Sequence, residues 1–525
     1  MLSLTTLRFP LVSLRASRNS PARLGSMLSC RRRASLPAPG RHKGRIPEWD
    51  TETRTDMRTV VQQAVSGGPL HTAFWEDEAE IGAGVKKPFK EVIDVSWGDP
   101  HRGGVKPLTF VRQVKVLAAC LYPQLMNGEK LPVDVRQRAQ KLLDGCAGWS
   151  VGSYSATGGL PEIVQRVSEF ISRRDGGVPS NPENIFLCCG SQWALTRILN
   201  VLVNAEAPYP TGVLTPAPCY STTTLSIEGL GGVVVPYYLS EERGWELQVE
   251  ELHRALESCK GACHPIALYV INPGNPAGQV QSRKSMQEVI RFASEKRLFL
   301  LADEVYQGCI YGEKEFVSYK RVLSEMGPPL SDTVELASFH SASKGFMGEC
   351  GLRGGYVELV NLDPAVKKHI YTLFCADSSP PVLGQIALDL MTNPPQPGDP
   401  SYLLYYQTQH IRSTVVKNVK KACEVINSLQ GFSCQAVEGG AFAFPRIHLP
   451  AKAIQKAKEA GMQPDTFYCL RLLEEAGVLA SPGSDYGQEE GTFHIRFCIL
   501  LPHDVLGELL RRLSDFHTQF MKDFS

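Results

Sequence analysis

The sequence predicts an α/β fold, with a large domain built on a mostly parallel sheet covered by helices on both faces and a smaller α+β domain. Between residues 154 and 360, short apolar runs of strand length alternate with longer runs whose apolar residues recur every three or four positions. That alternation is typical of β-α-β units, which build parallel sheets. The chain has 525 residues, of which 43% are hydrophobic, so it can bury a large core.

Seven strands are expected in the large domain, and their loops are where an α/β sheet places its ligands. Helices should separate them, as over 283–296, where Met286, Val289, Ile290 and Ala293 fall on one face. Another helix should begin near Pro161. The expected strands are 184–189, 211–214, 232–238, 266–271, 298–301, 334–339 and 354–360.

The flanking segments define the other parts of the chain. Residues 91–97 alternate like a strand and 110–121 have helical spacing, while the chain becomes mainly helical after Asp363. Late elements are expected as a long helix over 402–429, a strand-like stretch over 440–447 and a last helix over 503–520. The predicted parts are an N-terminal arm at 48–90 with a helix near 57–64, a small domain made of 91–145 and 376–525, and a large domain at 146–375.

The first 47 residues differ in charge from the rest. They contain nine arginines and one lysine, and the first acidic residue is Glu48. Leucines interleave with the arginines, as in an amphipathic import sequence, so we expect a transit peptide and a place in the mitochondrial matrix. The alternative is a basic tail that binds nucleic acid or membrane. Without these ten basic residues, of 55, the chain carries more acidic residues, 54, than basic ones, which argues against a nucleic-acid partner.

Two further classes of protein are disfavoured. No apolar run approaches the roughly 18 residues that span a bilayer, so no membrane partner is expected. The fifteen cysteines are scattered without the paired CxxC spacing of a zinc site, which favours free thiols and no metal.

The stretch 338–356 carries the strongest chemical signal. It places Lys344 after Ser341 and Ser343, with Arg353 nine positions further on in a glycine-rich segment. An amine nucleophile beside hydroxyls and a guanidinium suits pyridoxal 5'-phosphate, whose aldehyde condenses with lysine and whose phosphate needs such donors. The alternative is an exposed lysine in a glycine-rich loop.

Other segments supply what that cofactor needs. Asp303 ends an apolar strand, where a carboxylate would pair with the protonated pyridine nitrogen, and Tyr306 follows it within reach of the phenolic oxygen. Asp303 as a helix cap is the competing interpretation. After another strand, two Asn-Pro pairs form a turn that presents the amide of Asn275, unless the turn is only a tight loop.

Four more residues, Ser191, Gln192, Tyr220 and Arg496, each suit two roles in the residue pattern. Ser191 and Gln192 open a helix whose N-terminus suits a phosphate, although Ser191 is also an ordinary N-cap. Tyr220 is equally suited to stacking on the pyridine ring or to the core. Arg496 lies in an apolar strand and needs an anion, either a substrate carboxylate or a structural ion pair.

Together these segments resemble the class I pyridoxal-phosphate aminotransferases of fold type I, and within them the mitochondrial type of alanine aminotransferase. The resemblance covers the chain from about residue 85 to its end and rests on 173–179, 271–283, 298–307 and 338–356. It implies that Lys344 is the Schiff-base lysine and proton shuttle, Asp303 the partner of the ring nitrogen, and Tyr306 and Asn275 the phenolic-oxygen donors. The implied phosphate-binding residues are Ser191, Gln192, Ser341, Ser343 and Arg353.

The resemblance also implies partners and substrates. Tyr154 would reach the phosphate of a neighbouring subunit, which means a homodimer with shared active sites, and Arg496 and Gly98 would form the pocket for the substrate carboxylate. The expected reaction transfers the amino group of L-alanine to 2-oxoglutarate in two half-reactions. Trp97, Trp193 and 375–379 depart from the family pattern near this pocket. The Ser191-Gln192 text favours the alternative of a kynurenine or aminoadipate aminotransferase or β-lyase. From another class, the alternative is a catalytically silent cofactor-binding scaffold, which would need none of the site residues Lys344, Asp303, Tyr306 and Arg496.

Overall fold

The structure is a computed structural model that describes residues 70, 73, 87–107, 116–127, 131–345 and 347–525. The predicted transit peptide, the helix near 57–64, nearly all of the arm and the first part of the helix at 110–121 lie outside these residues. No helix in the described part of the chain is long and apolar enough to cross a membrane.

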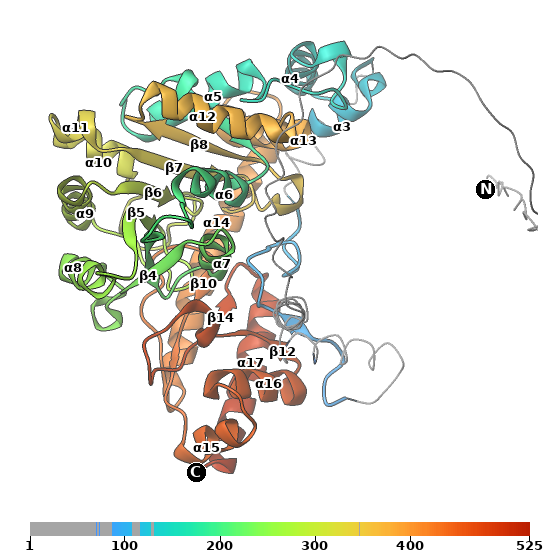
Figure 1. The fold of residues 1–525 in the computed structure, drawn as a ribbon. Helices are drawn as coiled ribbons and strands as arrows, with labels where there is room; N and C mark the ends of the chain where they lie inside the picture. The colour runs from blue at the N-terminus through green and yellow to red at the C-terminus, as the bar shows by residue number, and fades with distance from the viewer. Residues whose placement is uncertain (1–69, 71–72, 74–86, 108–115, 128–130, 346) are drawn as a thin grey trace, which may run out of the picture. The chain divides into compact units, whose positions relative to one another are not determined.

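A seven-stranded sheet lies at the centre of the described large domain, with the order β2-β8-β7-β6-β5-β3-β4 (Figure 1). Within it, β8 alone runs against its neighbours β7 and β2, so the predicted mostly parallel sheet is confirmed. The strands are β2 (Ile185–Cys188), β3 (Thr211–Ala217), β4 (Val233–Tyr238), β5 (His264–Ile271), β6 (Phe299–Asp303), β7 (Leu336–Ser341) and β8 (Gly355–Val360).

Helices cover both faces of this sheet, because successive strand residues point to opposite sides. In β6, Leu301 belongs to the core cluster under one layer of helices and Leu300 to the cluster under the other. The first layer contains α6 (Ser191–Leu202), α7 (Ser221–Gly229) and α12 (Pro364–Phe374). The second contains α5 (Pro161–Arg174), α8 (Val249–Ser258), α9 (Arg283–Lys296), α10 (Tyr319–Met326) and α13 (Val382–Thr392), with α11 (Leu330–Thr333) beside α9 and α10.

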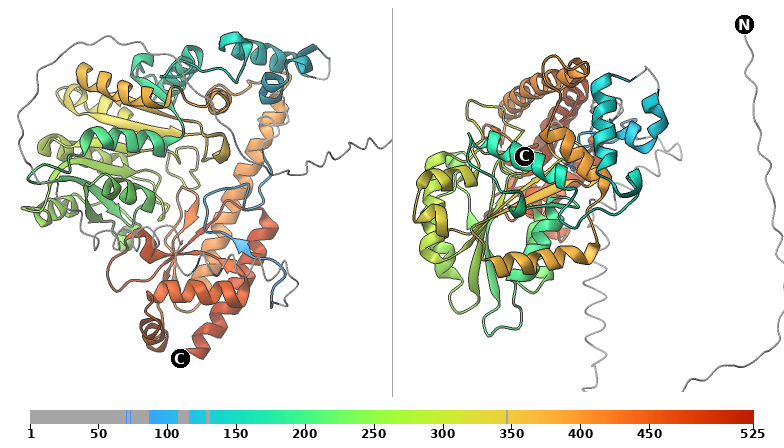
Figure 2. Two further views of the ribbon diagram at one scale, coloured as in Figure 1. Left: turned by 45° about the vertical axis from the view of Figure 1, so that its right-hand side comes forward. Right: turned by 90° about the horizontal axis from the view of Figure 1, so that it is seen from above.

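The C-terminal part forms small sheets flanked by helices. The long helix α14 (Tyr402–Ser428) runs from the side of the large sheet into this part, as Figure 2 shows in orange. The first strand, β1 (Ile93–Asp94), pairs in parallel with β12 (Val478–Leu479). The remaining elements are β9 (Phe432–Ser433), β10 (Phe442–Ala443), β11 (Arg446–Ile447), β13 (Ser481–Pro482), β14 (Ile495–Cys498), α15 (Ala451–Glu459), α16 (Pro464–Ala476) and α17 (His503–Asp523).

The predicted domain boundaries stay a prediction, and the packing adds detail to them. Helices α3 (Val116–Leu121) and α4 (Val133–Asp144) fall in a segment that the sequence assigned to the small domain. The core of α4, Leu142 and Leu143, belongs to the same cluster as Ile163 of α5 and Ile386 of α13. By their contacts, α4 and α13 therefore pack with the helices of the large domain, whereas β1 pairs with the small one.

Candidate active site

The predicted site residues come together where the parallel strands end. β6 ends at Asp303 and β7 at Ser341, and both strands run in the same direction as β5, which ends at Ile271. Carboxyl ends of parallel strands meet at one edge of a sheet, so the loops that follow converge there. Lys344 and Asn275 lie in these loops, three and four residues past their strands.

Lys344 lies against the segment that carries Gly98. Its Nζ donates a hydrogen bond to the Gly98 carbonyl oxygen at 3.0 Å and lies 5.9 Å from the centre of the Tyr306 ring. A Cβ on Gly98 would stand 2.7 Å from the Phe442 ring and 3.0 Å from Nζ itself. A residue without a side chain is therefore required beside the amine. The role of Gly98 in the substrate pocket, which the resemblance implies, stays a prediction.

Asp303 is buried on the same side of the sheet. Its Oδ2 accepts a hydrogen bond from the Tyr269 hydroxyl at 2.9 Å, and its Oδ1 accepts one from the Val305 amide at 3.3 Å. Burial raises the pKa of Asp303 to about 6, against the opposing effect of the Lys344 charge. The capping interpretation is wrong, because the next helix, α10, is capped by Ser318.

Arg496 and its neighbours form the other wall. Arg496 Nη1 donates to Asn275 Oδ1 at 3.2 Å, its Nη2 donates to the Ser96 carbonyl, and Asn275 Nδ2 lies 3.5 Å from the Tyr306 hydroxyl. The guanidinium is buried between two rings, with its carbon 3.9 Å from the centre of Phe442 and 4.5 Å from that of Tyr486.

The guanidinium of Arg496 forms no direct ion pair in the described part of the chain, although its charge opposes the burial that raises the pKa of Asp485. Among the described residues no carboxylate lies within salt-bridge distance of Arg496, and its Nε has no hydrogen-bond partner. The structural ion pair that the sequence left open is therefore absent from the described part of the chain. A buried cation with an unused donor suits a carboxylate ligand.

The residues that are expected to bind the cofactor phosphate lie around the start of α6. Gly190 precedes this helix with φ 87°, and an added Cβ there would stand 2.4 Å from Arg353 Nη2. Arg353 donates to the carbonyl oxygens of Cys350 and Cys189 at 2.9 and 3.2 Å, which holds its guanidinium beside the helix N-terminus. Ser191 begins the helix, so backbone N–H groups and the helix dipole face an anion placed here.

Two predicted phosphate ligands have other partners in this structure. Gln192 Nε2 donates to Ser226 Oγ at 3.0 Å, so it is the backbone amide of Gln192 that remains for a phosphate. Ser341 Oγ donates to the Gly354 carbonyl at 3.0 Å and accepts from the Ser343 amide at 3.0 Å. Ser341 therefore shapes the loop that carries Lys344, and Ser343 is buried next to it.

The two predicted tyrosines differ in exposure. Tyr220 immediately precedes α7 and lies near enough to Tyr306 and Tyr486 to influence their ionisation. Tyr154 is 79% exposed, in the loop before α5. Its proposed contact with a second subunit stays a prediction.

Several contributors were missed by the sequence analysis. Tyr269, which donates a hydrogen bond to Asp303, lies inside β5. From the sequence alone it is indistinguishable from an ordinary core residue, and the same is true of Phe442 and Tyr486, the rings that contact Arg496. Of the two tryptophans expected near the substrate, Trp193 packs edge-on against Phe374 of α12 at 4.7 Å, and Trp97 is half exposed beneath Arg102. A side-chain direction of this kind has no local signal in the sequence.

These residues fit pyridoxal phosphate. The amine of Lys344, the buried carboxylate of Asp303 and the N-terminus of α6 with Arg353 match the aldehyde, the ring nitrogen and the phosphate, while the unpaired Arg496 is left for a substrate carboxylate. When bound, the cofactor supplies an electron sink for a carbanion. Fold and site together define a pyridoxal-phosphate-dependent transaminase.

In the described residues, no group of three His, Cys, Asp or Glu side chains could hold a metal ion.

Comparison with known proteins gives the family. The family model described as "Aminotransferase class I and II" matches residues 116–513, and this chain belongs to that family. "Alanine aminotransferase 2" of Xenopus laevis is 49% identical over 467 residues, 89% of this chain and 86% of that protein. "Alanine aminotransferase 1" of Homo sapiens is 48% identical over 467 residues, covering 89% and 94%.

Two further likenesses bear on function and fold. "Glutamate–glyoxylate aminotransferase 2" of Arabidopsis thaliana is 41% identical over 448 residues, 84% of this chain and 92% of that protein. The solved alanine aminotransferase of Pyrococcus furiosus aligns with a TM-score of 0.66 at 22% identity, covering 86% of this chain and 96% of that one. That structure, like the other solved aminotransferases that match, supports fold type I.

Proposed function

We propose that this enzyme transfers the amino group of L-alanine to 2-oxoglutarate and forms pyruvate and L-glutamate, as a homodimer in the mitochondrial matrix. The observation that carries the reaction is the 48–49% identity, over nearly nine-tenths of the chain, to proteins named alanine aminotransferase. The site supports it, because Arg496, which forms no ion pair with the described residues, is left for a carboxylate, and Lys344 supplies an amine.

Each residue has a task in this reaction. Arg496, held flat between Phe442 and Tyr486, binds the carboxylate of the amino acid or oxo acid through two parallel hydrogen bonds. Lys344 Nζ accepts the proton from the α-carbon of the amino acid and returns one when the reaction runs in the other direction. The carboxylate of Asp303 would pair with the ring nitrogen of the cofactor, because the hydrogen bond from Tyr269 holds that carboxylate in place.

A panel of amino donors and oxo acids tests the substrates. We expect L-alanine with 2-oxoglutarate to give the highest kcat/KM. Strong turnover of kynurenine or aminoadipate with negligible alanine turnover would instead favour the rival aminotransferase, and the relative from Arabidopsis thaliana makes glyoxylate a necessary acceptor in the panel. A protein that binds the cofactor and turns over no donor would support the silent scaffold.

The homodimer is supported by exposed apolar side chains around α4. Tyr122 and Leu125 lie between α3 and α4, and Leu403 and Tyr406 lie at the start of α14. Ser401, which precedes α14, donates to Asp134 of α4. Monomers rarely expose so many large apolar side chains close together. Light scattering of the purified enzyme should give twice the chain mass, and a monomer at micromolar concentration would contradict the dimer.

The matrix location rests on the acid-free, arginine-rich segment 1–47. A fluorescent protein fused after residue 60 should co-localise with a matrix marker. Replacing the arginines of that segment by glutamine should leave the fusion in the cytosol. A fusion that ignores this change would contradict the import role.

A further inference from the structure

Two cysteines lie next to each other where the end of α14 meets the segment after β9. Cys423 belongs to the last two turns of α14, and Cys434 follows β9 directly. Asn427, one turn after Cys423 on the same face of the helix, accepts a hydrogen bond from the Cys434 amide at 2.7 Å and donates one to the Cys434 carbonyl at 3.0 Å. The side chain of Asn427 therefore holds the backbone of Cys434 against the helix face that carries Cys423.

The two thiols also contact each other. A hydrogen bond joins their sulfur atoms, and the Cys423 sulfur accepts a second hydrogen bond from the backbone amide of Val437. The Cys434 sulfur lies 3.4 Å from the Gln435 carbonyl oxygen, which attracts a protonated thiol and repels a thiolate. When one of the two thiols ionises, the negative charge therefore resides on Cys423 and the proton stays on Cys434.

This arrangement gives the two thiols different chemical properties. The hydrogen bond between the sulfur atoms lowers the pKa of Cys423 below its ordinary value and raises the pKa of Cys434. Both side chains are partly exposed, so a small oxidant can reach them. The thiolate is the nucleophilic form of cysteine, and a neighbouring thiol captures its first oxidation product. Cys423 therefore suits the reacting thiol and Cys434 the resolving thiol.

A second pair of neighbouring thiols in the same chain lacks these features. Cys259 follows α8 and Cys263 precedes β5, and a hydrogen bond also joins their sulfur atoms. Each of these two residues is only 6% exposed, and burial raises the pKa of Cys263. This pair has the proximity of the first pair without its access to solvent, so it serves as an internal control.

We propose that Cys423 and Cys434 form a modification site, a dithiol that a peroxide oxidises to a disulfide and that small thiols reduce again. The Cys423 thiolate attacks one oxygen of hydrogen peroxide, the O–O bond breaks, and a sulfenic acid and a hydroxide ion form. The hydroxide takes up the proton that Cys423 released and becomes the first water. The Cys434 sulfur then attacks the sulfenic sulfur, the S–O bond breaks, and the Cys434 proton leaves with the hydroxyl group as the second water. Two electrons pass from the sulfur atoms to the peroxide.

The bond that forms links two elements of the C-terminal part. It closes the loop 424–433, which contains β9, onto the end of α14. Because β9 pairs with β11 through Ser433 and Arg446, the disulfide connects this small sheet covalently to the helix. Reduction reverses the step, when a small thiolate attacks one of the two sulfur atoms and the mixed disulfide is then released by a second thiol.

Mass spectrometry of the holoenzyme tests the proposal. The reduced enzyme is treated with hydrogen peroxide near neutral pH, its remaining thiols are blocked with iodoacetamide, and the protein is digested without reduction. We expect a Cys423–Cys434 disulfide that disappears after treatment with dithiothreitol. It should form at least tenfold faster than a Cys259–Cys263 disulfide in the same sample, because only the first pair combines access with an acidic thiol.

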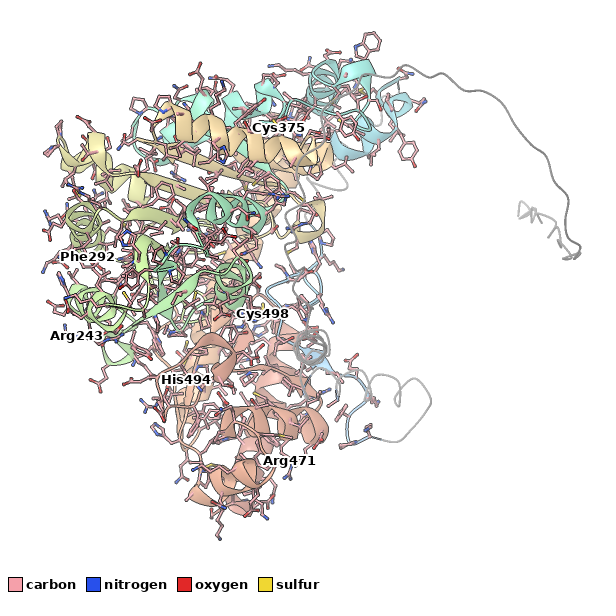
Figure 3. The ribbon with its side chains drawn as sticks, viewed as in Figure 1. Arg243, Phe292, Cys375, Arg471, His494 and Cys498 are labelled. Carbon is pink, nitrogen blue, oxygen red and sulfur yellow. The ribbon has the colours of Figure 1, made fainter. Side chains whose placement is uncertain are left out.

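Two variants and a matched control assign the roles of the two thiols. In Cys434→Ser, oxidation of Cys423 should stop at the sulfenic acid, which dimedone labels, whereas in Cys423→Ser dimedone should label Cys434 at least tenfold more slowly. Cys375→Ser removes an exposed thiol just after α12, labelled in Figure 3, and should leave the rate of disulfide formation within twofold. A Cys423–Cys434 disulfide that forms no faster than the Cys259–Cys263 disulfide, or faster labelling of Cys434 than of Cys423, would overturn the proposal.

Discussion

Replacement of Arg496 separates a ligand-binding guanidinium from a structural one. In Arg496→Lys the positive charge remains, but the flat fork between Phe442 and Tyr486 is lost, and with it one of two charge-assisted hydrogen bonds to the substrate carboxylate. Such a bond contributes about 1.5–3 kcal/mol, which corresponds to a fall in kcat/KM for L-alanine of about 10- to 150-fold.

The free energy of unfolding gives the complementary measurement. A buried ion pair that loses one partner destabilises a protein by about 3–5 kcal/mol. Since Arg496 has no carboxylate within salt-bridge distance among the described residues, Arg496→Met breaks no ion pair and leaves only the acceptors of Asn275 and Ser96 unbonded. We therefore expect the free energy of unfolding of the cofactor-free protein, measured by urea denaturation, to fall by about 1–3 kcal/mol.

A matched control exists in the same domain. Arg471 also lies over two aromatic rings, those of Phe467 and Phe524, and its label in Figure 3 stands below that of Cys498, the last residue of β14. Arg471→Lys should change kcat/KM less than twofold. If Arg496→Lys kept kcat/KM within threefold of wild type, or Arg496→Met unfolded the protein, the assignment of Arg496 as the carboxylate-binding residue would be refuted.

Three further predictions follow from the site. Asp303→Asn should remove a pH dependence of stability. Because burial raises the pKa of Asp303 from 3.8 to about 6, the free energy of unfolding of the cofactor-free wild type should fall by about 1.4 kcal/mol relative to the variant between pH 5 and pH 8. Urea denaturation measures this difference, and equal pH slopes for the two proteins would contradict it. If Tyr154 acts across the dimer, mixing inactive Tyr154→Ala and Lys344→Ala proteins should restore activity as mixed dimers form, each with one intact site, whereas no recovery after subunit exchange would place Tyr154 in its own site. Gln192→Ala should change the cofactor dissociation constant less than threefold in a fluorescence titration, because the side chain bonds Ser226, and a tenfold loss would show that it reaches the phosphate.

Local signals explain what the sequence predicted well. The helix expected over 283–296 begins and ends at those residues because Ser282 accepts a hydrogen bond from the Ser285 amide and fixes the start. The strand before Asp303 was recognisable from its apolar run. Since ligands lie at the carboxyl ends of parallel strands, the loops with Asn275 and Lys344 could be placed in one site without coordinates.

Long-range pairing explains what the sequence did not predict. β1 pairs with β12, which lies more than 380 residues further along the chain. β8 runs antiparallel to β7 in the large sheet. Neither the pairing nor the direction of a strand produces a periodic pattern in the sequence. Side-chain direction was equally hidden, as for Gln192, whose amide turns to α7. The burial of Arg496 was predicted, but the two rings that hold it come from segments about 10 and 54 residues before it in the chain, and only tertiary packing brings them together.

The neighbouring acids Asp303 and Glu304 show how packing assigns chemistry to similar side chains. Both are buried, and burial raises the pKa of Asp303 to about 6 and that of Glu304 to about 7. Strand alternation sends them to opposite faces of the sheet. Glu304 accepts from the Tyr319 amide at 2.8 Å and from Ser338 Oγ at 2.6 Å, so both of its oxygens hold α10 and β7 in place. Asp303 is held by Tyr269 and one backbone amide, and a carboxylate oxygen accepts more than one hydrogen bond, so acceptor capacity remains for a cofactor. The raised pKa is therefore shared by a structural acid and a ligand-binding acid, and what distinguishes them is which face of β6 they occupy.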